Sequence, residues 1–442
     1  MDITAIYRRL VFWISDFLKG SPIRTPYKEI EYISTHSKSE GDKIRMEKLK
    51  ALLRHARSNT EFYSSIDSEC LTDFPVMNKR LLLEHYDDIA VDINRIPGQT
   101  GPLHIQSTSG STGTPFAIPQ DTLKRYRRIA ELKYFGKVVG FRSHDRLIHL
   151  RTWNKWQNKT QKQIRTENII PFDISSMSKD RLQSLSELIS ASKAVCLRGY
   201  ASSFDLLAQH VKDNGGSFPS LKIIIAGSEA LHDDVRAKVK KYLKCEIISQ
   251  YANEECGILA QEVPPTSSDG NVMYLNHSGY IFEILKPESD EPAGYGEPGR
   301  IVITDLHNYA FPIIRYDSGD IGIMLAPDER SNGYPVLGKL YGRRFDICYT
   351  TSGLPFSPMT IGRILKHFDQ IIQWQFVQKG EKEYLLRLIV KDSYVSSSTE
   401  AVILKELKDI LGEEASVKTE ITDDIPVLSS GKRKPVVNEW KR

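Results

Sequence analysis

The sequence has few of the features that define disulfide-stabilised, zinc-binding or membrane-spanning proteins. Its five cysteines are scattered over 442 residues, and none forms a CxxC pair or lies at a zinc-ligand spacing from a histidine. This pattern argues against a disulfide framework and predicts a reducing, cytoplasmic location. No apolar run is long enough to cross a bilayer, and no segment is repeated along the chain.

The chain also lacks an excess of charge of one sign. With 60 Lys and Arg against 56 Asp and Glu, the formal net charge is +4, which gives no general argument for a nucleic-acid partner. The local basic cluster of Lys124, Arg125, Arg127 and Arg128 is interpreted as a solvated helix face, so we expect no nucleic-acid binding. The apolar fraction of 40% is typical of a globular enzyme, and the length predicts two or three domains.

The N-terminal segment, residues 1–20, is the one candidate for a targeting role. Its apolar run at residues 10–14 is too short for a signal peptide or a bilayer span. Apolar residues recur there at helical spacing and predict an amphipathic helix: Ile3, Ile6, Leu10, Trp13 and Phe17. The favoured interpretation is that this helix packs on the protein's own core. The alternative is peripheral contact with the inner face of a membrane through Trp13, Arg8 and Arg9.

Short apolar runs that end in glycine and precede helical periodicity, such as KAVCLRGY at 193–200 and LKIIIAGS at 221–228, predict the fold class. They indicate an α/β protein with mostly parallel sheets and helices. From about Gly294 the chain changes to alternating strands and tight turns, which predicts a β-rich subdomain. Two helical segments around a hairpin then predict a small α+β unit. We therefore expect a large N-terminal domain over 1–342 and a small mobile C-terminal domain over 343–442.

An uncharged segment rich in hydroxyl groups, STSGSTGTP at 107–115, stands apart from this pattern. Glycines let a backbone approach an anion closely, and successive N–H groups with Ser and Thr hydroxyls can bind phosphate. The segment is not a Walker A loop, because no Lys follows the second Gly at the required spacing. Its composition alone leaves a flexible spacer and a phosphate-binding loop equally open.

The segment resembles the phosphate-binding loop of the adenylate-forming enzymes, whose pattern is [ST]-S-G-[ST]-T-G-x-P. This family comprises the acyl-CoA synthetases, the adenylation domains of non-ribosomal peptide synthesis and the luciferases. Five further segments are similar to motifs of the family in the same order: IIIAGSEAL at 223–231, SQYANEECGILA at 249–260, RYDSGDIG at 315–322, YGRRFD at 341–346 and SSGKRKP at 429–435.

The resemblance implies a nucleotide-binding role for most of these segments. Tyr251 would stack on adenine, Asp320 would accept both ribose hydroxyls, and Arg343 would lie near the ribose and phosphates. The residues that would line the adenine pocket are Gly227, Ser228 and Glu229. The residues that would bind phosphate are Ser109, Gly110, Ser111, Thr112, Gly113 and Thr114.

The resemblance also implies three catalytic residues, which are Lys432, Glu255 and Thr112. Glu255 would hold the Mg²⁺ that bridges the phosphates, and Lys432 would reach into the site during adenylation. Both fit the chemistry, since a carboxylate must approach the α-phosphate of ATP and cations must stabilise the two anions. Taken singly, Asp320 is also typical of a turn, Tyr251 of a core and Lys432 of a solvated basic tail. Glu254 is interpreted as the solvated neighbour of Glu255.

The N-terminal half resembles one branch of this family, the phenylacetate–CoA ligases, and within it the CapK-like proteins associated with capsular polysaccharide synthesis. The similar segments are LKALLRHARSNTEFYSSI, FPVMNKRLLLEHYDDI and LRGYASS, where Ala201 replaces a proline of the branch pattern. Phe116 stands where relatives often have a Lys after the loop, so one phosphate-binding cation is lost. Phe345 takes the first Asp position of the hinge pattern, which leaves Asp346 as the hinge candidate. Only His277 and Cys256 occur where some relatives bind a metal, so we expect no zinc.

The resemblance implies an ATP- and Mg²⁺-dependent ligase that activates a carboxylic acid as acyl-AMP. The acceptor stays open between CoA, a carrier-protein thiol and a sugar amine or hydroxyl on a glycan. A scaffold with weakened catalysis in a glycan assembly complex is the alternative, although Glu255, Asp320 and Lys432 argue against it. We expect the acyl pocket near Trp153, Tyr200 and the strand before Glu255. No side chain there identifies the acid: no buried cation stands out to pair with the carboxylate-distal group of an amino acid, and no phenyl pocket can be recognised.

Overall fold

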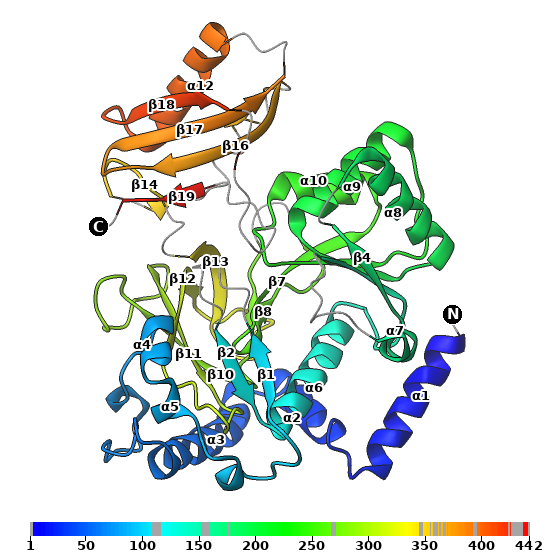
Figure 1. Cartoon of the computed structure of the whole chain (residues 1–442), viewed down its shortest axis with the longest axis vertical. Helices are drawn as coiled ribbons and strands as arrows, with labels where there is room; N and C mark the ends of the chain where they lie inside the picture. Colours follow the sequence, from blue (N-terminus) through cyan, green and yellow to red (C-terminus); the bar gives the residue numbers. More distant parts are fainter. Residues whose placement is uncertain are drawn as a thin grey trace. The chain divides into compact units, whose positions relative to one another are not determined.

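The computed structural model describes residues 3–107, 116–151, 160–174, 177–266, 271–343, 348–353, 355–356, 361, 364–365, 368, 370–391, 396–422, 425 and 436–440 (Figure 1). The chain divides into two compact units. The large unit runs to Lys339 and the small unit begins at Leu340, with the short segment Gly319–Ile321 grouped with the small one. The domain boundary at residues 342/343 stays a prediction.

A seven-stranded sheet forms the centre of the large unit, in the order β4-β3-β5-β6-β7-β8-β9. The first five strands in this order run parallel, and β8 and β9 are antiparallel to their neighbours. The strands are β3 (Leu147–Arg151), β4 (Ile169–Asp173), β5 (Cys196–Gly199), β6 (Ile223–Gly227), β7 (Glu246–Asn253), β8 (Gly257–Gln261) and β9 (Tyr274–Leu275). The predicted α/β class with a mostly parallel sheet is confirmed.

Apolar cores lie on both faces of this sheet. Leu197 and Ile224 point to one face, where they pack with α8 (Lys179–Ser192), α9 (Ala201–Asn214) and α10 (Asp233–Tyr242). Cys196 and Ile223 point to the other face, beside Val139. Parallel strands covered on both faces are apolar at successive positions, which explains runs such as IIIAG. The short helix α7 (Gln161–Glu167) connects β3 to β4.

In the view of Figure 1 the N-terminal helices and α6 (Thr122–Val138) lie below the seven-stranded sheet, and of these α6 packs against β8. The N-terminal helices are α1 (Ile3–Leu18), α2 (Arg24–Thr35), α3 (Lys38–Asn59), α4 (Lys79–Glu84) and α5 (Tyr86–Ile89). Two side chains show how their ends are fixed: Asn78 caps α4 by accepting the Leu81 N–H, and Asp121 caps α6 by accepting the Lys124 N–H. None of the described helices is both long and apolar enough to cross a membrane.

The interpretation of the basic cluster on α6 as a solvated face is wrong. Lys124 and Arg127 are only 0% and 2% exposed. Lys124 Nζ lies 2.5 Å from Asp305 Oδ2, and Arg127 Nη1 lies 2.6 Å from Glu29 Oε1. Because α6 packs between α2 and β8, these two side chains are buried against acids from distant parts of the chain, as buried charges must be, whereas Arg125 and Arg128 are only partly buried.

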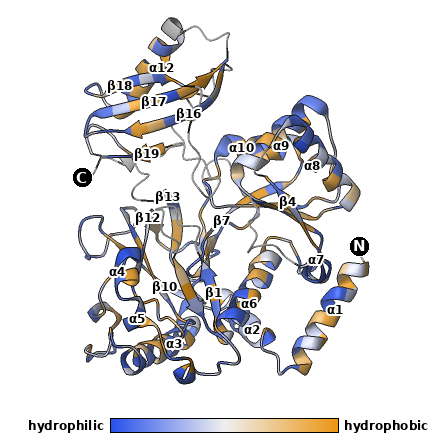
Figure 2. Ribbon diagram, viewed as in Figure 1, coloured by the Kyte–Doolittle hydropathy of each residue, from blue (hydrophilic) through white to orange (hydrophobic). Residues whose placement is uncertain are grey.

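The prediction that α1 packs on the core holds for only part of the helix. Phe12 and Trp13 pack against a core cluster that includes Tyr134 and Phe135 of α6. In contrast, Ile3 is 79% exposed, Leu10 57% and Phe17 65%. Figure 2 shows apolar residues along the whole length of this helix. The described chain therefore covers only one side of it.

Two further sheets lie mainly in the large unit: a two-stranded sheet at the hairpin around the predicted phosphate loop, and a four-stranded sheet in the second half of the unit, with parts of β12 and β13 grouped with the small unit. The antiparallel pair β1 (His104–Ser107) and β2 (Ala117–Gln120) flanks that loop. A four-stranded sheet contains β10 (Tyr280–Leu285), β11 (Pro298–Asp305), β12 (Tyr316–Leu325) and β13 (Val336–Arg343). The described strands thus agree with the β-rich segment predicted from about Gly294.

The small unit contains a four-stranded sheet in the order β18-β17-β16-β19. Its elements are β14 (Cys348–Tyr349), β15 (Pro355–Phe356), β16 (Ile371–Gln378), β17 (Glu383–Val390), α12 (Ser396–Leu411), β18 (Ser416–Ile421) and β19 (Val436–Asn438). Phe376, Leu386 and Leu407 are fully buried in its core. The predicted α+β character of this unit, with a hairpin followed by a helix, is confirmed.

Candidate active site

The carboxyl ends of β3, β5, β6 and β7 meet at one edge of the central sheet. The strand order reverses there, because β4 lies on one side of β3 while β5, β6 and β7 follow on the other. In open α/β sheets, ligands bind outside the carboxyl ends of the strands at such a reversal. The predicted adenine motifs include Gly227, the last residue of β6, and Tyr251, near the end of β7, so they lie at the edge where a ligand is expected.

The end of β6 combines open space with an unusual backbone. Gly227 pairs with Gln250 of β7, and a Cβ added to it would meet only the Gln250 carbonyl oxygen, at 3.4 Å. Ser228 follows in the left-handed conformation, with φ of 66°. Glu229 Oε2 accepts the Ser202 N–H at 3.0 Å and so fixes the first turn of α9. Gly227 therefore leaves room at the edge, whereas the Glu229 carboxylate is already engaged.

Tyr251 brings two of the predicted motifs together. Its side chain is only 8% exposed, and its hydroxyl donates to Ser318 Oγ at 3.4 Å. Ser318 Oγ in turn donates to the Ile301 carbonyl at 3.0 Å. This chain links the end of β7 to β12, two residues before Asp320. The tyrosine ring is thus held in one orientation at the strand end.

The two adjacent glutamates after β7 differ in their surroundings. Glu255 is buried, at 8% exposed, while Glu254 is partly exposed. Glu254 Oε2 accepts from Gln106 Nε2 at 2.7 Å, and the Glu255 carbonyl accepts from Gln120 Nε2 at 3.5 Å. Gln106 and Gln120 lie on β1 and β2, so both strands that flank the predicted phosphate loop contact the predicted magnesium-binding turn.

Asp320 lies within β12, partly exposed, directly after Gly319 with φ of 77°. The left-handed glycine interrupts the regular strand immediately before the aspartate. Asp317, three residues earlier, pairs with Arg300 at 2.8 Å and is a structural partner. Arg343 is the last residue of β13.

Several predicted residues lie outside the described residues. They are Ser109, Gly110, Ser111, Thr112, Gly113, Thr114, Trp153, Phe345, Asp346 and Lys432. Phe116, which replaces the lysine of relatives, is fully buried. Its ring packs edge-on against Phe311, with centroids 6.2 Å apart, so this position supplies core packing beside the loop.

The predicted magnesium ligand fits the donor set that Mg²⁺ takes in nucleotide sites. This ion is usually held by one or two carboxylates together with substrate phosphates and water. Within the described ranges no group of three or more His, Cys, Asp and Glu could hold a metal ion. Glu255, a buried carboxylate next to the hairpin around the predicted phosphate loop, is compatible with this donor set.

Sequence reasoning missed Arg198, a cation on β5 near the same edge. It is partly buried, and burial lowers the pKa of its guanidinium. Its Nη2 donates to Gln250 Oε1. Arg198 is hard to recognise in the sequence because it lies within the apolar run KAVCLRG, although strand alternation puts it on the face opposite Leu197. Tyr200, expected at the acyl pocket, lies two residues after Arg198, and burial raises the pKa of its hydroxyl.

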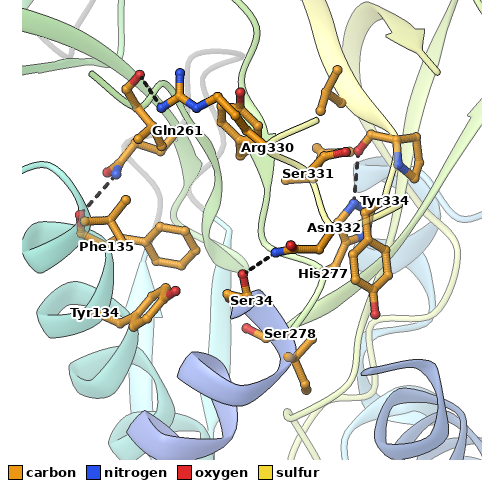
Figure 3. Close-up of a pocket in the computed structure, with 17 residues that line it drawn as sticks. Ser34, Tyr134, Phe135, Gln261, His277, Ser278, Arg330, Ser331, Asn332 and Tyr334 are labelled. Atoms are coloured by element: carbon orange, nitrogen blue, oxygen red, sulfur yellow. Dashed lines mark hydrogen bonds between the residues drawn. The ribbon is translucent and has the colours of Figure 1, made fainter. Parts of the chain in front are cut away.

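A cavity of about 180 Å³ lies elsewhere in the large unit. Residues of α2, α6, β8 and β9 line it, among them Phe135 and Gln261, together with His277 from the loop after β9 (Figure 3). None of the predicted nucleotide-binding residues belongs to its wall. This cavity is therefore distinct from the candidate active site.

Comparison with known proteins bears out the resemblance. Residues 348–439 match the family model of the CapK C-terminal domain. The chain is 21% identical over 399 residues to a phenylacetate–coenzyme A ligase of Escherichia coli, covering 84% of this chain and 86% of that protein. It is 25% identical over 349 residues to the same enzyme of Aromatoleum evansii, covering 74% of this chain and 76% of the relative.

Solved structures of ligases share the fold. A 2-hydroxyisobutyryl-CoA ligase in the postadenylation state, in complex with 2-HIB-AMP, aligns with a TM-score of 0.70 and 19% identity over 92% of this chain and 91% of that one. An open form of that ligase with 2-HIB-AMP and CoA aligns with a TM-score of 0.60 and 19% identity, over 91% and 92% of the two chains. ATP-bound MatB of Rhodopseudomonas palustris aligns with a TM-score of 0.55 and 16% identity, over 75% and 66%.

Proposed function

We propose that this chain, which has the fold of the adenylate-forming ligases and carries a CapK C-terminal domain, activates a carboxylic acid with ATP and Mg²⁺ and transfers the acyl group to CoA. The observation that carries the proposal is the link from Tyr251 through Ser318 to the strand of Asp320. It joins the segments expected to hold adenine and ribose at the carboxyl edge of the parallel sheet. The named relatives are CoA ligases, and those ligase structures hold ATP or acyl-AMP.

In the proposed reaction a carboxylate oxygen of the acid attacks the α-phosphorus, and the bond from that phosphorus to the bridging oxygen breaks. Pyrophosphate leaves with the negative charge, so no proton needs to move in this half-reaction. When bound, Mg²⁺ at Glu255 would neutralise charge on the phosphates. Ser109 to Thr114 would bind the phosphates through backbone N–H groups and hydroxyls, Thr112 would contact the reacting phosphate, and Lys432 would stabilise the developing charge.

The side chains that would hold the nucleoside part of ATP match the chemistry of adenine and ribose. Tyr251 offers an aromatic face for adenine, where offset stacking contributes about 1 kcal/mol. Gly227 and Ser228 would border the purine, and Glu229 would hold the first turn of α9 beside it. Asp320 would accept both ribose hydroxyls, because an ionised carboxylate only accepts, and Arg343 would approach the ribose and phosphates.

The second half-reaction defines the rest of the proposal. The small domain, 343–442, would rotate about residues 343–346, with Asp346 as the hinge, and the CoA thiolate would attack the acyl carbon and release AMP. A carrier-protein thiol or a glycan amine or hydroxyl is the alternative acceptor, and surface polysaccharide synthesis is the proposed context. The reducing compartment predicted from the cysteines agrees with cytoplasmic chemistry.

Substitution of Lys432 tests whether this residue serves the first half-reaction only. Because Lys432 would act in adenylation only, Lys432→Ala should lower acid-dependent pyrophosphate exchange by on the order of 100-fold or more. Thioester formation from supplied acyl-AMP should persist near the wild-type rate. Lys434→Ala, in the same basic tail, is the matched control and should retain both activities. Equal loss of both half-reactions in Lys432→Ala would refute the role.

A panel of acids separates the ligase from a nucleotide-binding scaffold. We expect ATP- and acid-dependent pyrophosphate release by the wild type, and thioester accumulation only when CoA is added. Asp320→Ala should raise the KM for ATP with little change in the KM for the acid. No release with any acid, in a protein that still binds ATP, would favour the scaffold. Release without thioester formation would favour another acceptor.

A further inference from the structure

The turn that carries Glu255 is held by side chains from three other elements of the large unit. It comprises residues 254–256 and connects β7 to β8. Each of its carbonyl oxygens accepts a hydrogen bond from a side chain: the Glu254 carbonyl from Arg128 Nη1 at 3.1 Å, the Glu255 carbonyl from Gln120 Nε2 at 3.5 Å and the Cys256 carbonyl from the Tyr280 hydroxyl at 2.7 Å. The donors come from α6, β2 and β10, so distant parts of the chain determine where this turn lies.

These bonds fix the two peptide planes that flank the Cα atom of Glu255. The plane before it contains the Glu254 carbonyl, to which Arg128 donates. The plane after it contains the Glu255 carbonyl and the Cys256 N–H, and this N–H donates to Asn253 Oδ1 at 2.8 Å. Because peptide groups are planar, fixing both planes sets φ and ψ of Glu255. The direction in which its side chain leaves the backbone is therefore set by the surrounding side chains.

Tyr280, the third of these donors, is itself oriented by a buried ion pair. Its side chain is fully buried, and Lys124 Nζ donates to its hydroxyl oxygen at 3.3 Å. Lys124 Nζ also lies 2.5 Å from Asp305 Oδ2. Since an ammonium group can only donate, the phenolic hydrogen is directed to the Cys256 carbonyl. The buried lysine of α6 thus keeps the tyrosine in the donor orientation that the turn needs.

Gly257, the residue directly after the turn, allows these donors to approach so closely. Its φ of 124° lies in the region that favours glycine. A Cβ at this position would lie 3.2 Å from the Tyr280 hydroxyl oxygen and 3.7 Å from Arg128 Nε. The two side chains therefore converge on the end of the turn, where the backbone leaves space for both.

We propose that Arg128 and Tyr280 are positioning residues for Glu255, which direct its carboxylate toward Mg²⁺ by holding the turn 254–256. The inference rests on the proposed ligase function, and it assigns a role to Arg128 and Lys124 of the basic cluster on α6. A ligand side chain must be held to within roughly 0.5 Å of its productive position. Outer groups that orient a metal ligand therefore change metal affinity when they are removed.

Metal affinity in variants of the two residues tests the inference. Arg128→Met keeps an unbranched apolar stem and removes the donors, and Tyr280→Phe removes a single hydroxyl group. Electron paramagnetic resonance measures the Kd for Mn²⁺ of the full-length protein with a non-hydrolysable ATP analogue. The Mg²⁺ concentration for half-maximal acid-dependent pyrophosphate release is measured beside it. Both values should rise on the order of 10-fold in each variant, while the KM for the acid stays unchanged.

Two comparisons separate positioning from a general structural effect. Lys137→Met removes another basic side chain of α6, one whose Nζ pairs with Glu31 at 2.9 Å, and it should bind Mn²⁺ as the wild type does. Because Arg128 would act through Glu255, Arg128→Met should add nothing to the loss of Mn²⁺ affinity that Glu255→Gln causes. Arg128 is only partly buried, so Arg128→Met should keep a thermal midpoint close to that of the wild type.

The outcomes distinguish this inference from the proposed function. An unchanged Kd for Mn²⁺ in Arg128→Met, or a loss that adds to that of Glu255→Gln, overturns the inference and leaves the ligase intact. Weaker binding of the ATP analogue by Arg128→Met without metal would show a direct contact with phosphate, which also overturns it. If no acid supports pyrophosphate release, the ligase function fails, and the Mn²⁺ measurements still decide the inference.

Discussion

At the scale of single residues, Gly227 gives the sharpest test of the nucleotide site. Its backbone is outside the left-handed region and a new Cβ would make one ordinary contact, at 3.4 Å. Gly227→Ala should therefore change the free energy of unfolding by no more than about 0.5 kcal/mol. The added methyl group would occupy space proposed for adenine, so we expect the KM for ATP to rise on the order of 10-fold. Steady-state kinetics and thermal unfolding check both parts, and an unchanged KM would contradict the adenine assignment.

Single residues also show what sequence could and could not predict. The position of Tyr251 and Glu255 at the end of a strand followed from a motif and a short apolar run, because both signals are local. The surroundings of Arg198 and Lys124 could not be predicted from such local signals, since each depends on residues far along the chain. Gln250 orients Arg198, and Asp305 neutralises Lys124. A basic residue looks the same in sequence whether its partner is water, a buried acid or a substrate.

At the scale of elements, α1 packs against α6 through aromatic and basic side chains. Lys133 Nζ lies 3.6 Å from the centroid of the Phe12 ring, and the His144 ring lies 5.3 Å from it. Burial lowers the pKa of Lys133 to about 8 and the pKa of His144 to about 4. His144 donates through Nδ1 to the Thr166 carbonyl when neutral. The contact between α1 and its neighbours therefore favours the uncharged form of His144.

The low pKa of His144 predicts a pH dependence of stability. Between pH 6.5 and about 4 the unfolded state binds a proton that the folded state does not, so stability falls as pH is lowered through this window. His144→Asn should reduce the fall, because asparagine tolerates the positive φ of 67° at this position and does not titrate. Thermal midpoints of both proteins at pH 7, 6, 5 and 4 check this. Parallel pH profiles would refute it.

The elements themselves were predicted unequally well. Strands such as β5 and β6 are buried on both faces and stand out as apolar runs, and Asn78 marks the start of α4 as a helix cap does. How the helices pack could be predicted less well from the sequence. The sequence pattern of α1 predicts an amphipathic helix, but its periodicity cannot say which of two apolar sides meets the core. Phe12 and Trp13 do so, while Ile3 and Leu10 are exposed.

At the scale of the whole molecule, that exposed side of α1 offers an apolar surface of the kind that marks interaction sites. Large apolar side chains follow it from end to end, and they are Ile3, Tyr7, Leu10, Val11, Ile14, Phe17 and Leu18. Its one acid, Asp16, is buried and accepts the backbone N–H groups of Ile23 and Arg24 at 2.9 Å. The exposed side thus combines apolar residues with no negative charge, and Lys19 follows directly. Two of the residues expected to contact a membrane, Trp13 and Arg9, instead face the protein: Trp13 packs on the core, and Arg9 pairs with Asp145 at 2.7 Å. We propose that the exposed apolar side lies on an anionic membrane surface, where its apolar side chains insert between the headgroups and Lys19 contacts them.

Vesicle binding tests this placement. The protein should sediment with vesicles of phosphatidylcholine and phosphatidylglycerol, and less with phosphatidylcholine alone or at high salt. Leu10→Gln and Ile14→Gln should each weaken binding on the order of 10-fold, because each removes apolar area worth about 1.5–3 kcal/mol when buried. Leu206→Gln, at an exposed leucine of α9, should bind as the wild type does. Light scattering without lipid decides the competing explanation. A stable dimer that dissociates in Leu10→Gln would assign the surface to a second copy of the chain, and the membrane proposal would then be wrong.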